Sequence, residues 1–147
     1  MNFTHTLIVM FIGSFIIQYY LMSLVMSNTF YNVTNSFGKL YLSIIMGLFM
    51  ILLEVLMHDS SYNVLSYKYY IAVGLLLFTF IYFYRQQVYI FDEQYIKEMI
   101  EHHSMALLTS NKILEKTNNY DVAKLAKNII QNQTDEINIM RNILHKI

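Results

Sequence analysis

Charged side chains are almost absent from the first 84 residues of this 147-residue chain. The Asp, Glu, Lys and Arg residues of that segment are Lys39, Glu54, Asp59 and Lys68 alone. The remaining eight acidic and eight basic groups all lie in residues 85–147. Such segregation is typical of a chain with one part in lipid and one part in water. We therefore predict a transmembrane domain over residues 1–84 and an extramembrane domain over residues 85–147.

Three apolar runs in the first domain are candidates for membrane spans. The first covers about residues 7–26, which is long enough for the roughly 30 Å hydrocarbon core of a bilayer. The second covers about residues 40–57 and the third about residues 69–84, with tyrosines at both ends as in an interfacial belt. A cleaved signal peptide is the alternative for the first run, but it lacks a preceding positive region. The pattern indicates a multi-pass integral membrane protein in contact with the lipid bilayer.

The second domain has the pattern of two amphipathic helices. From Phe91 to about Lys116, apolar residues recur every three or four positions, and His103 occupies a core position among them. A second stripe follows the polar turn at residues 117–121, where Asp121 is placed to cap the next helix. We predict an antiparallel two-helix hairpin.

The connection from the third span to this hairpin contains no helix breaker. No Pro or Gly lies between Gly74 and Lys116, so we expect the third span to continue unbroken into the first hairpin helix. The alternative is a break near Asp92, whose carboxylate would cap a fresh helix.

Two amphipathic helices cannot enclose a core alone, because each stripe needs covering on more than one side. We therefore expect hairpins of different copies to pair into a four-helix bundle. The result would be a homo-oligomer, either a dimer or a higher even number. The expected fold class is all-α, with three transmembrane helices followed by the hairpin.

Two adjacent histidines in the first hairpin helix have methionines nearby. Residues three and four apart share a helix face, which places Met99 beside His102 and His103. A thioether beside imidazole suits copper, especially Cu(I). Folding the hairpin brings an amide, a carboxylate and another thioether opposite. We predict a transition-metal site, copper first and zinc second, at Met99, His102, His103, Gln133, Glu136 and Met140.

The same residues also have a metal-free interpretation, with no cofactor. A buried histidine bonded to Gln133 or Glu136 would set how the bundle packs, since a buried polar group mainly requires a partner. Met99 and Met140 would then fill the core. Ferritin-type di-iron chemistry is disfavoured, because the Glu-x-x-His repeats that it needs are absent.

A methionine-rich face occurs in the second span, where Met46, Met50, Glu54 and Met57 are spaced by four, four and three residues. An ionisable side chain within a span is costly and is by default a sign of function. Copper permeation along this face is therefore a further alternative. In the structural alternative, the methionines fill helix contacts and Glu54 reaches water at the interface.

Two motifs carry a family resemblance. Residues 98–110 read EMIEHHSMALLTS, and Leu125-Ala126, Ile129, Gln133, Glu136-Ile137 and Met140 follow at fixed spacing. These residues resemble M-I-P-H-H-x-x-A followed by L-A-x-x-I-x-x-x-Q-x-x-E-I-x-x-M, the hallmark of the family called domain of unknown function 305. Arg85, Asp92 and the second span resemble its membrane-anchored branch. Glu101 departs from the pattern, in which Pro is usual, and adds a carboxylate beside the histidines.

The resemblance implies a ferritin-like helical fold and an association with copper binding or tolerance, often outside the cytoplasm. It favours the extracytoplasmic side for the hairpin domain, whereas Arg85 and Lys97 favour the inside by the positive-inside rule. Three spans put the 27–39 loop on the same side as the hairpin. That loop contains Asn32-Val33-Thr34, which matches a glycosylation sequon.

Composition disfavours other classes of function. The formal net charge is zero, without the basic footprint of a nucleic-acid binder. The chain has no cysteine for a disulfide or thiolate site. No nucleophile constellation and no Gly-rich phosphate loop is present, so we expect no catalytic activity.

Overall fold

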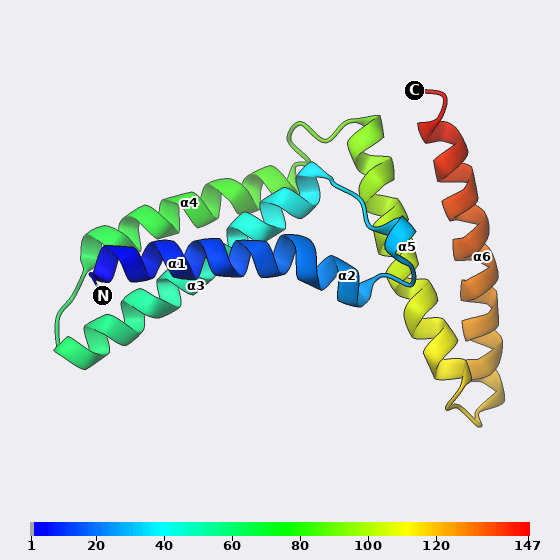
Figure 1. Ribbon diagram of the computed structural model, residues 1–147, viewed down its shortest axis with the longest axis horizontal. Coiled ribbons are helices and arrows are strands. Elements are labelled where there is room, and N and C mark those ends of the chain that lie inside the picture. The colour runs from blue at the N-terminus through cyan, green and yellow to red at the C-terminus, as the bar shows by residue number, and fades with distance from the viewer. Residues whose placement is uncertain (1) are drawn as a thin grey trace. The chain divides into compact units, whose positions relative to one another are not determined.

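The structure is a computed structural model that describes residues 2–147, which are all-α and contain no strand (Figure 1). The all-α prediction is confirmed. The helices are α1 (Phe3–Ile16), α2 (Met22–Met26), α3 (Phe37–Tyr62), α4 (Tyr67–Arg85), α5 (Asp92–Leu114) and α6 (Tyr120–Leu144). A π-helical turn (Ile17–Leu21) joins α1 to α2, and a short 3₁₀ turn (Phe30–Asn32) precedes α3.

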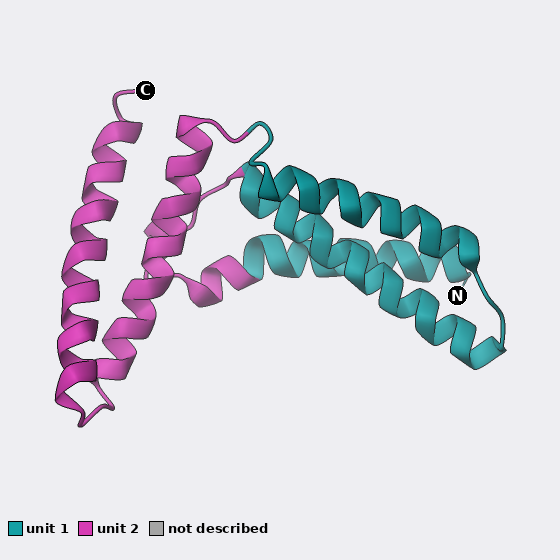
Figure 2. Ribbon diagram, turned by 180° about the vertical axis from the view of Figure 1, so that it is seen from behind, with its two compact units in different colours: residues 1–21, 37–89 teal, residues 22–36, 90–147 magenta. Residues whose placement is uncertain are grey.

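The chain divides into two compact units, which Figure 2 shows in two colours. One unit contains α1, the π-helical turn, α3 and α4. The other contains residues 22–36 together with residues 90–147. The segment between the first two apolar helices thus packs with the carboxyl-terminal hairpin, although it lies far from it in the sequence.

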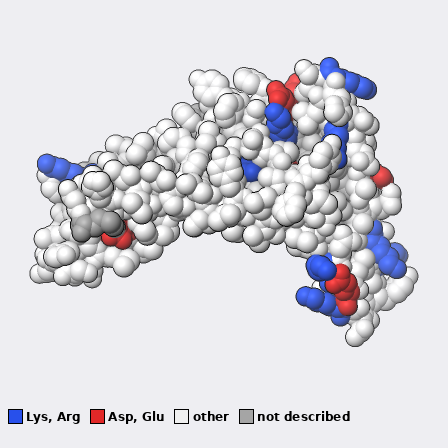
Figure 3. All heavy atoms as spheres, in the orientation of Figure 1, with Lys and Arg blue, Asp and Glu red and all other residues white. Residues whose placement is uncertain are grey.

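The first unit consists of apolar helices, the first of which continues along the chain into α2, a part of the other unit. Phe3–Met26, Phe37–Tyr62 and Tyr67–Arg85 are each long and apolar enough to cross a membrane, and each extends beyond the run expected from the sequence. The central helix, α3, packs against both α1 and α4. On the face drawn in Figure 3, these helices are almost bare of charge, and most charged side chains gather over the hairpin.

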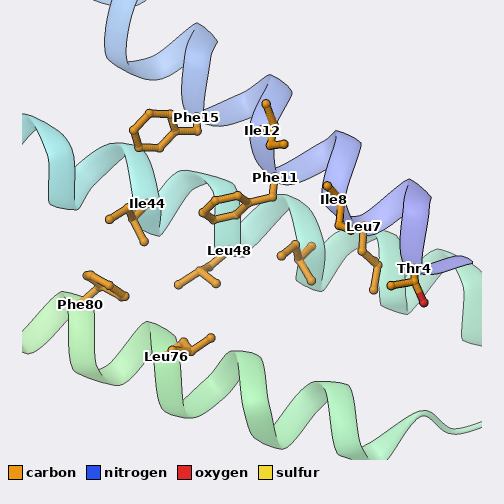
Figure 4. Close-up of a pocket in the computed structure, with 11 residues that line it drawn as sticks. Thr4, Leu7, Ile8, Phe11, Ile12, Phe15, Ile44, Leu48, Leu76 and Phe80 are labelled. Atoms are coloured by element: carbon orange, nitrogen blue, oxygen red, sulfur yellow. The ribbon is translucent and has the colours of Figure 1, made fainter.

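Phe11 and Gly47 define the contact between α1 and α3. A Cβ atom at position 47 would lie 2.6 Å from Cδ2 of Phe11, so only glycine lets the ring approach this closely. An apolar groove between α1 and α4 runs over α3 next to this contact. Figure 4 shows the residues that line it, among them Phe11, Leu48 and Phe80.

The apolar helix α4 does not continue into α5, so the expected unbroken rod is wrong. Gln87 and Tyr89 have φ angles of 52° and 58°, a left-handed conformation that ends an α-helix. The hydroxyl of Tyr41 on α3 donates to the carbonyl oxygen of Val88 at 2.9 Å and holds this turn. A hydrogen bond from another helix therefore stabilises this left-handed turn, although the turn contains no Pro or Gly that would have predicted it from the sequence.

The hairpin helices also begin differently from expectation. Phe91 is the N-cap of α5 and makes no side-chain cap, while Asp92 lies in the first turn, where the helix dipole favours a carboxylate. Asn119, and not Asp121, caps α6. Its Oδ1 accepts from the backbone N–H groups of Asp121 at 2.9 Å and Val122 at 3.2 Å.

Candidate functional site

The hairpin is held together by an apolar seam between α5 and α6. Its buried residues are Ile96, Ile100, Leu107 and Ile137. His103 lies three residues after Ile100 and four before Leu107, so α5 presents it on the face that packs against α6. The histidine therefore lies at the edge of the core, as the periodicity predicted.

His103 and Glu136 form the closest approach among the predicted metal ligands. Nδ1 of His103 lies 3.1 Å from Oε2 of Glu136, and the two side chains are 20% and 50% exposed. The ring does not aim Nδ1 at that oxygen, so this buried nitrogen has no hydrogen-bond partner among the described residues. Nε2 of Gln133 donates to the same Glu136 oxygen at 3.3 Å. The structure thus brings three of the predicted residues together.

Burial lowers the pKa of the His103 imidazole below its usual value, although the carboxylate of Glu136 opposes the shift and His102 adds to it. The neutral form of this ring is therefore favoured at neutral pH. Neutral imidazole is the form that binds metals.

The other predicted ligands differ in their surroundings. His102 is exposed, and Met99 is half-buried. Met140 packs against the apolar seam. Within residues 2–147, no group of three or more His, Cys, Asp or Glu side chains is placed to hold a metal ion. The groups that the structure shows in contact here are therefore an imidazole, a carboxylate and an amide.

Glu98 is a further polar group near the site that the motif did not single out. Its Oε2 atom is buried without a hydrogen-bond partner in the described chain. Burial raises the pKa of its carboxyl, a shift that His102 opposes and Glu101 reinforces. The sequence could have indicated Glu98, because it lies four residues before His102 and residues at this spacing share a helix face.

Glu101 contacts the segment that connects α2 to α3. We call residues 27–36 the docked loop. Oε2 of Glu101 accepts from the backbone N–H of Thr34 at 2.9 Å, and the Thr34 hydroxyl donates to the carbonyl oxygen of Lys97 at 2.6 Å. The carboxylate that departs from the family pattern thus holds the docked loop against α5.

Ser104 makes the innermost contact of the docked loop. Its side chain is fully buried, and its hydroxyl oxygen accepts from the Asn28 backbone N–H at 2.9 Å and from Nδ2 of Asn32 at 3.0 Å. Sequence reasoning did not find this group, because more than 70 residues separate the partners and no periodicity links them. The histidine pair therefore lies in the same turn of α5 that holds the loop.

The methionine-rich face of α3 lies largely on the surface of its unit. Met46 and Met57 are 43% and 58% exposed, while Met50 and Glu54 are half-buried. The helices α1 and α4 therefore do not enclose this face. Permeation along it would require other copies of the chain to surround it.

The fold and site define an all-α protein with three helices able to cross a membrane and a polar hairpin bearing a histidine pair. Residues 84–145 match the family described as "Domain of unknown function (DUF305)". The hairpin domain thus matches this family, as the motif resemblance indicated.

A second comparison extends beyond the hairpin. A protein of Acanthamoeba polyphaga mimivirus, named "Uncharacterized protein L153", is 29% identical to this chain over 138 residues. The match covers 94% of this chain and 90% of the viral protein, so the likeness includes the apolar helices. No solved structure matches the chain.

Proposed function

We propose that this chain is an integral membrane protein whose hairpin domain, on the extracytoplasmic side, binds a transition metal, with copper preferred to zinc. The observation that carries the proposal is the buried Nδ1 of His103, which lacks a hydrogen bond and lies 3.1 Å from the Glu136 carboxylate. A buried nitrogen lone pair without a partner is costly. A metal ion shared with the carboxylate would satisfy it.

The spacing of the two atoms suits a shared metal. Ligands bound at about 2.1 Å in a tetrahedral site lie roughly 3.4 Å from each other, close to the observed separation. When bound, the metal would supply a positive centre that holds both groups. Structural sites usually have four ligands, so further ligands must come from elsewhere.

A second copy of the hairpin is the proposed source of these ligands. Leu125 and Ile139 on α6 are 60% and 58% exposed, although apolar residues are normally covered in a stable bundle. Pairing of two hairpins would cover such residues and complete a four-helix bundle. Met99 and His102 are the groups that such pairing would bring to the metal.

The test is metal analysis of the full chain, purified in detergent and loaded with Cu(I), Cu(II) or Zn(II), with the oligomer mass measured on the same sample. We expect near-stoichiometric copper in the wild type and at least a roughly tenfold weaker affinity in His103→Ala and Glu136→Ala. His145→Ala, at an exposed histidine beyond α6, is the matched control. Equal metal content in His103→Ala and wild type would refute the site.

A structural polar layer is the second candidate function, and the close approach of His103 on α5 to Glu136 on α6 favours it. In that case His103 and Glu136 would only set how hairpins pack between chains. The wild type would then take up no metal, and His103→Ala would lose the oligomer. Metal uptake that disappears in His103→Ala while the oligomer persists supports metal binding instead.

A further inference from the structure

Helix α6 has two stripes of regularly spaced residues, and α5 covers one of them. The inner stripe contains Ile130, Ile137, Met140 and Leu144, which pack with the buried residues of α5. The second, which we call the outer stripe, recurs at alternating intervals of three and four residues and consists of Val122, Leu125, Ile129, Asn132, Glu136, Ile139 and Ile143. Four of its five apolar residues are at least 40% exposed. Such spacing is the heptad pattern of a helix that pairs with another helix.

The docked loop lies on the flank of α6 opposite to the outer stripe. The loop accepts hydrogen bonds from Arg141, and Thr134 and Asn138 line a pocket together with it. Successive residues of a helix are rotated by about 100°, which places these three residues on one side of the inner stripe and the outer stripe on the other side. The outer stripe is therefore the flank of α6 that neither α5 nor the docked loop covers.

The two polar residues of the outer stripe restrict what can cover it. Asn132 and Glu136 are both exposed in the single chain. A lipid or a purely apolar surface would bury them without hydrogen-bond partners, which is costly. A suitable partner helix must offer an acceptor to the Asn132 amide and a donor to the Glu136 carboxylate. A second copy of α6 offers both.

The orientation of the second copy follows from the positions of these two residues. In a parallel pair each residue faces its own counterpart, so the two Glu136 carboxylates would repel each other. An antiparallel pair centred on position 134 instead matches polar residues with polar ones and apolar residues with apolar ones. A shift of this register by one heptad would set both polar residues against apolar ones. The pairs in the matched register are Asn132 with Glu136, Ile129 with Ile139, and Leu125 with Ile143.

We propose that two copies of this chain pair through the outer stripes of their α6 helices, in this antiparallel register. The amide of Asn132 then donates to the Glu136 carboxylate of the second copy. The same carboxylate lies 3.1 Å from Nδ1 of His103, so each copy contributes a residue to the candidate site of the other. The inference rests on the pairing of hairpins in the proposed function, but it holds with or without a bound metal.

Disulfide cross-linking tests the register, because the chain has no native cysteine. The full chain in detergent, with a chelator present, is oxidised with diamide and analysed on a non-reducing gel. We expect a covalent dimer from Ile129→Cys/Ile139→Cys and from Leu125→Cys/Ile143→Cys. Positions 129 and 139 lie about 15 Å apart along one helix, too far for a disulfide within one chain. For the same reason, Ile129→Cys alone and Ile139→Cys alone should give no dimer in the antiparallel register.

The matched control is Lys124→Cys/Thr134→Cys, which has the same ten-residue spacing on the exposed surface of α6 but lies outside the outer stripe. Equal cross-linking of this control would show random collision and overturn the proposal. A dimer from Ile129→Cys alone would indicate a parallel pair and would also overturn it. The absence of a dimer from both double-cysteine variants would do the same.

Asn132→Ala tests the polar pair. We expect the dissociation constant of the dimer, measured by sedimentation in detergent, to rise at least about tenfold, because the Glu136 carboxylate would lose its donor from the second copy. Asn138→Ala is the control, since Asn138 is an exposed asparagine on the flank of the docked loop. An unchanged dissociation constant in Asn132→Ala would contradict the pairing with Glu136.

Metal uptake by the wild type separates this proposal from the proposed metal site. Cross-linking in the matched register without metal uptake would retain the interface and refute the metal site. Metal uptake without cross-linking would refute the interface and retain the metal site.

Discussion

At the scale of single residues, neighbouring side chains in one turn of α5 face three different surroundings, namely the docked loop, α6 and solvent. Glu101 and Ser104 bind the docked loop, His103 faces Glu136 on α6, and His102 is exposed. Adjacent residues on a helix point about 100° apart, which accounts for this division. The motif therefore contains a candidate metal ligand, His103, next to the residues that bind the docked loop to α5.

Ser104→Ala should lower the free energy of unfolding by about 1 to 3 kcal/mol, because two donors from the loop, of which the Asn32 amide is buried, would lose their shared acceptor. Denaturant titration would measure the loss, and hydrogen exchange at the Asn28 amide should become faster. Ser110→Ala is the control, since Ser110 is also buried on α5 but lies away from these bonds. Equal effects of the two substitutions would contradict the assigned role.

Glu98→Gln should stabilise the protein at pH 7 and have little effect near pH 4. Burial raises the pKa of the Glu98 carboxyl above its usual 4.5, so the folded state favours the protonated form. The stability that this proton provides is present below pH 4.5 and is lost as the pH rises through the folded-state pKa. Glutamine mimics the protonated group without ionising.

Thermal unfolding between pH 4 and pH 8 with a chelator present would test this, so that bound metal plays no part. Glu115→Gln is the control, because Glu115 is exposed and pairs with Lys112 at the surface. A destabilising effect of Glu98→Gln at pH 7 would show that the carboxylate has a partner in the folded state.

At the scale of helices, periodicity and apolar run length predicted three long apolar segments followed by two amphipathic ones, and the structure confirms this order over residues 2–147. The ends of the helices were predicted less well. The turn at Gln87 and Tyr89 depends on a bond from α3, and the cap of α6 is Asn119, although Asp121 is equally able to cap. Local sequence leaves such choices open, and contacts or loop geometry decide them.

Gly47→Ala should weaken the packing of α1 on α3 by about 1 to 3 kcal/mol, since the added methyl group would overlap the ring of Phe11. Gly74→Ala on α4 is the matched control, because a Cβ there meets nothing within 4 Å. Thermal midpoints in detergent would compare the two. A midpoint for Gly47→Ala equal to that of Gly74→Ala would show that Phe11 moves aside without cost.

At the scale of the whole molecule, the docked loop places residues 22–36 in the same compact unit as the hairpin. A loop that folds with the hairpin must lie on the same side of a membrane as the hairpin. Three crossings by Phe3–Met26, α3 and α4 would satisfy this requirement, because the loop then shares its side with the residues that follow α4. The contacts of the docked loop with the hairpin are therefore consistent with three membrane crossings.

Single cysteines introduced into this cysteine-free chain would test that arrangement. In sealed vesicles we expect Asn35→Cys in the docked loop and Asn118→Cys in the hairpin turn to react with a membrane-impermeant maleimide from one side. Asn63→Cys in the turn between α3 and α4 should react from the other side. Labelling of all three positions from one side would exclude three crossings.

The sequence by itself determined the all-α class, the three long apolar helices, the hairpin and its family. These features follow from composition and periodicity, which each segment carries within itself. Only the tertiary structure decided that His103 meets Glu136 while His102 does not, and that Asn32 is buried against Ser104 instead of being exposed as a sequon in a loop. Both outcomes depend on side-chain contacts between segments that are distant in the sequence. No local pattern encodes which donor bonds to which acceptor.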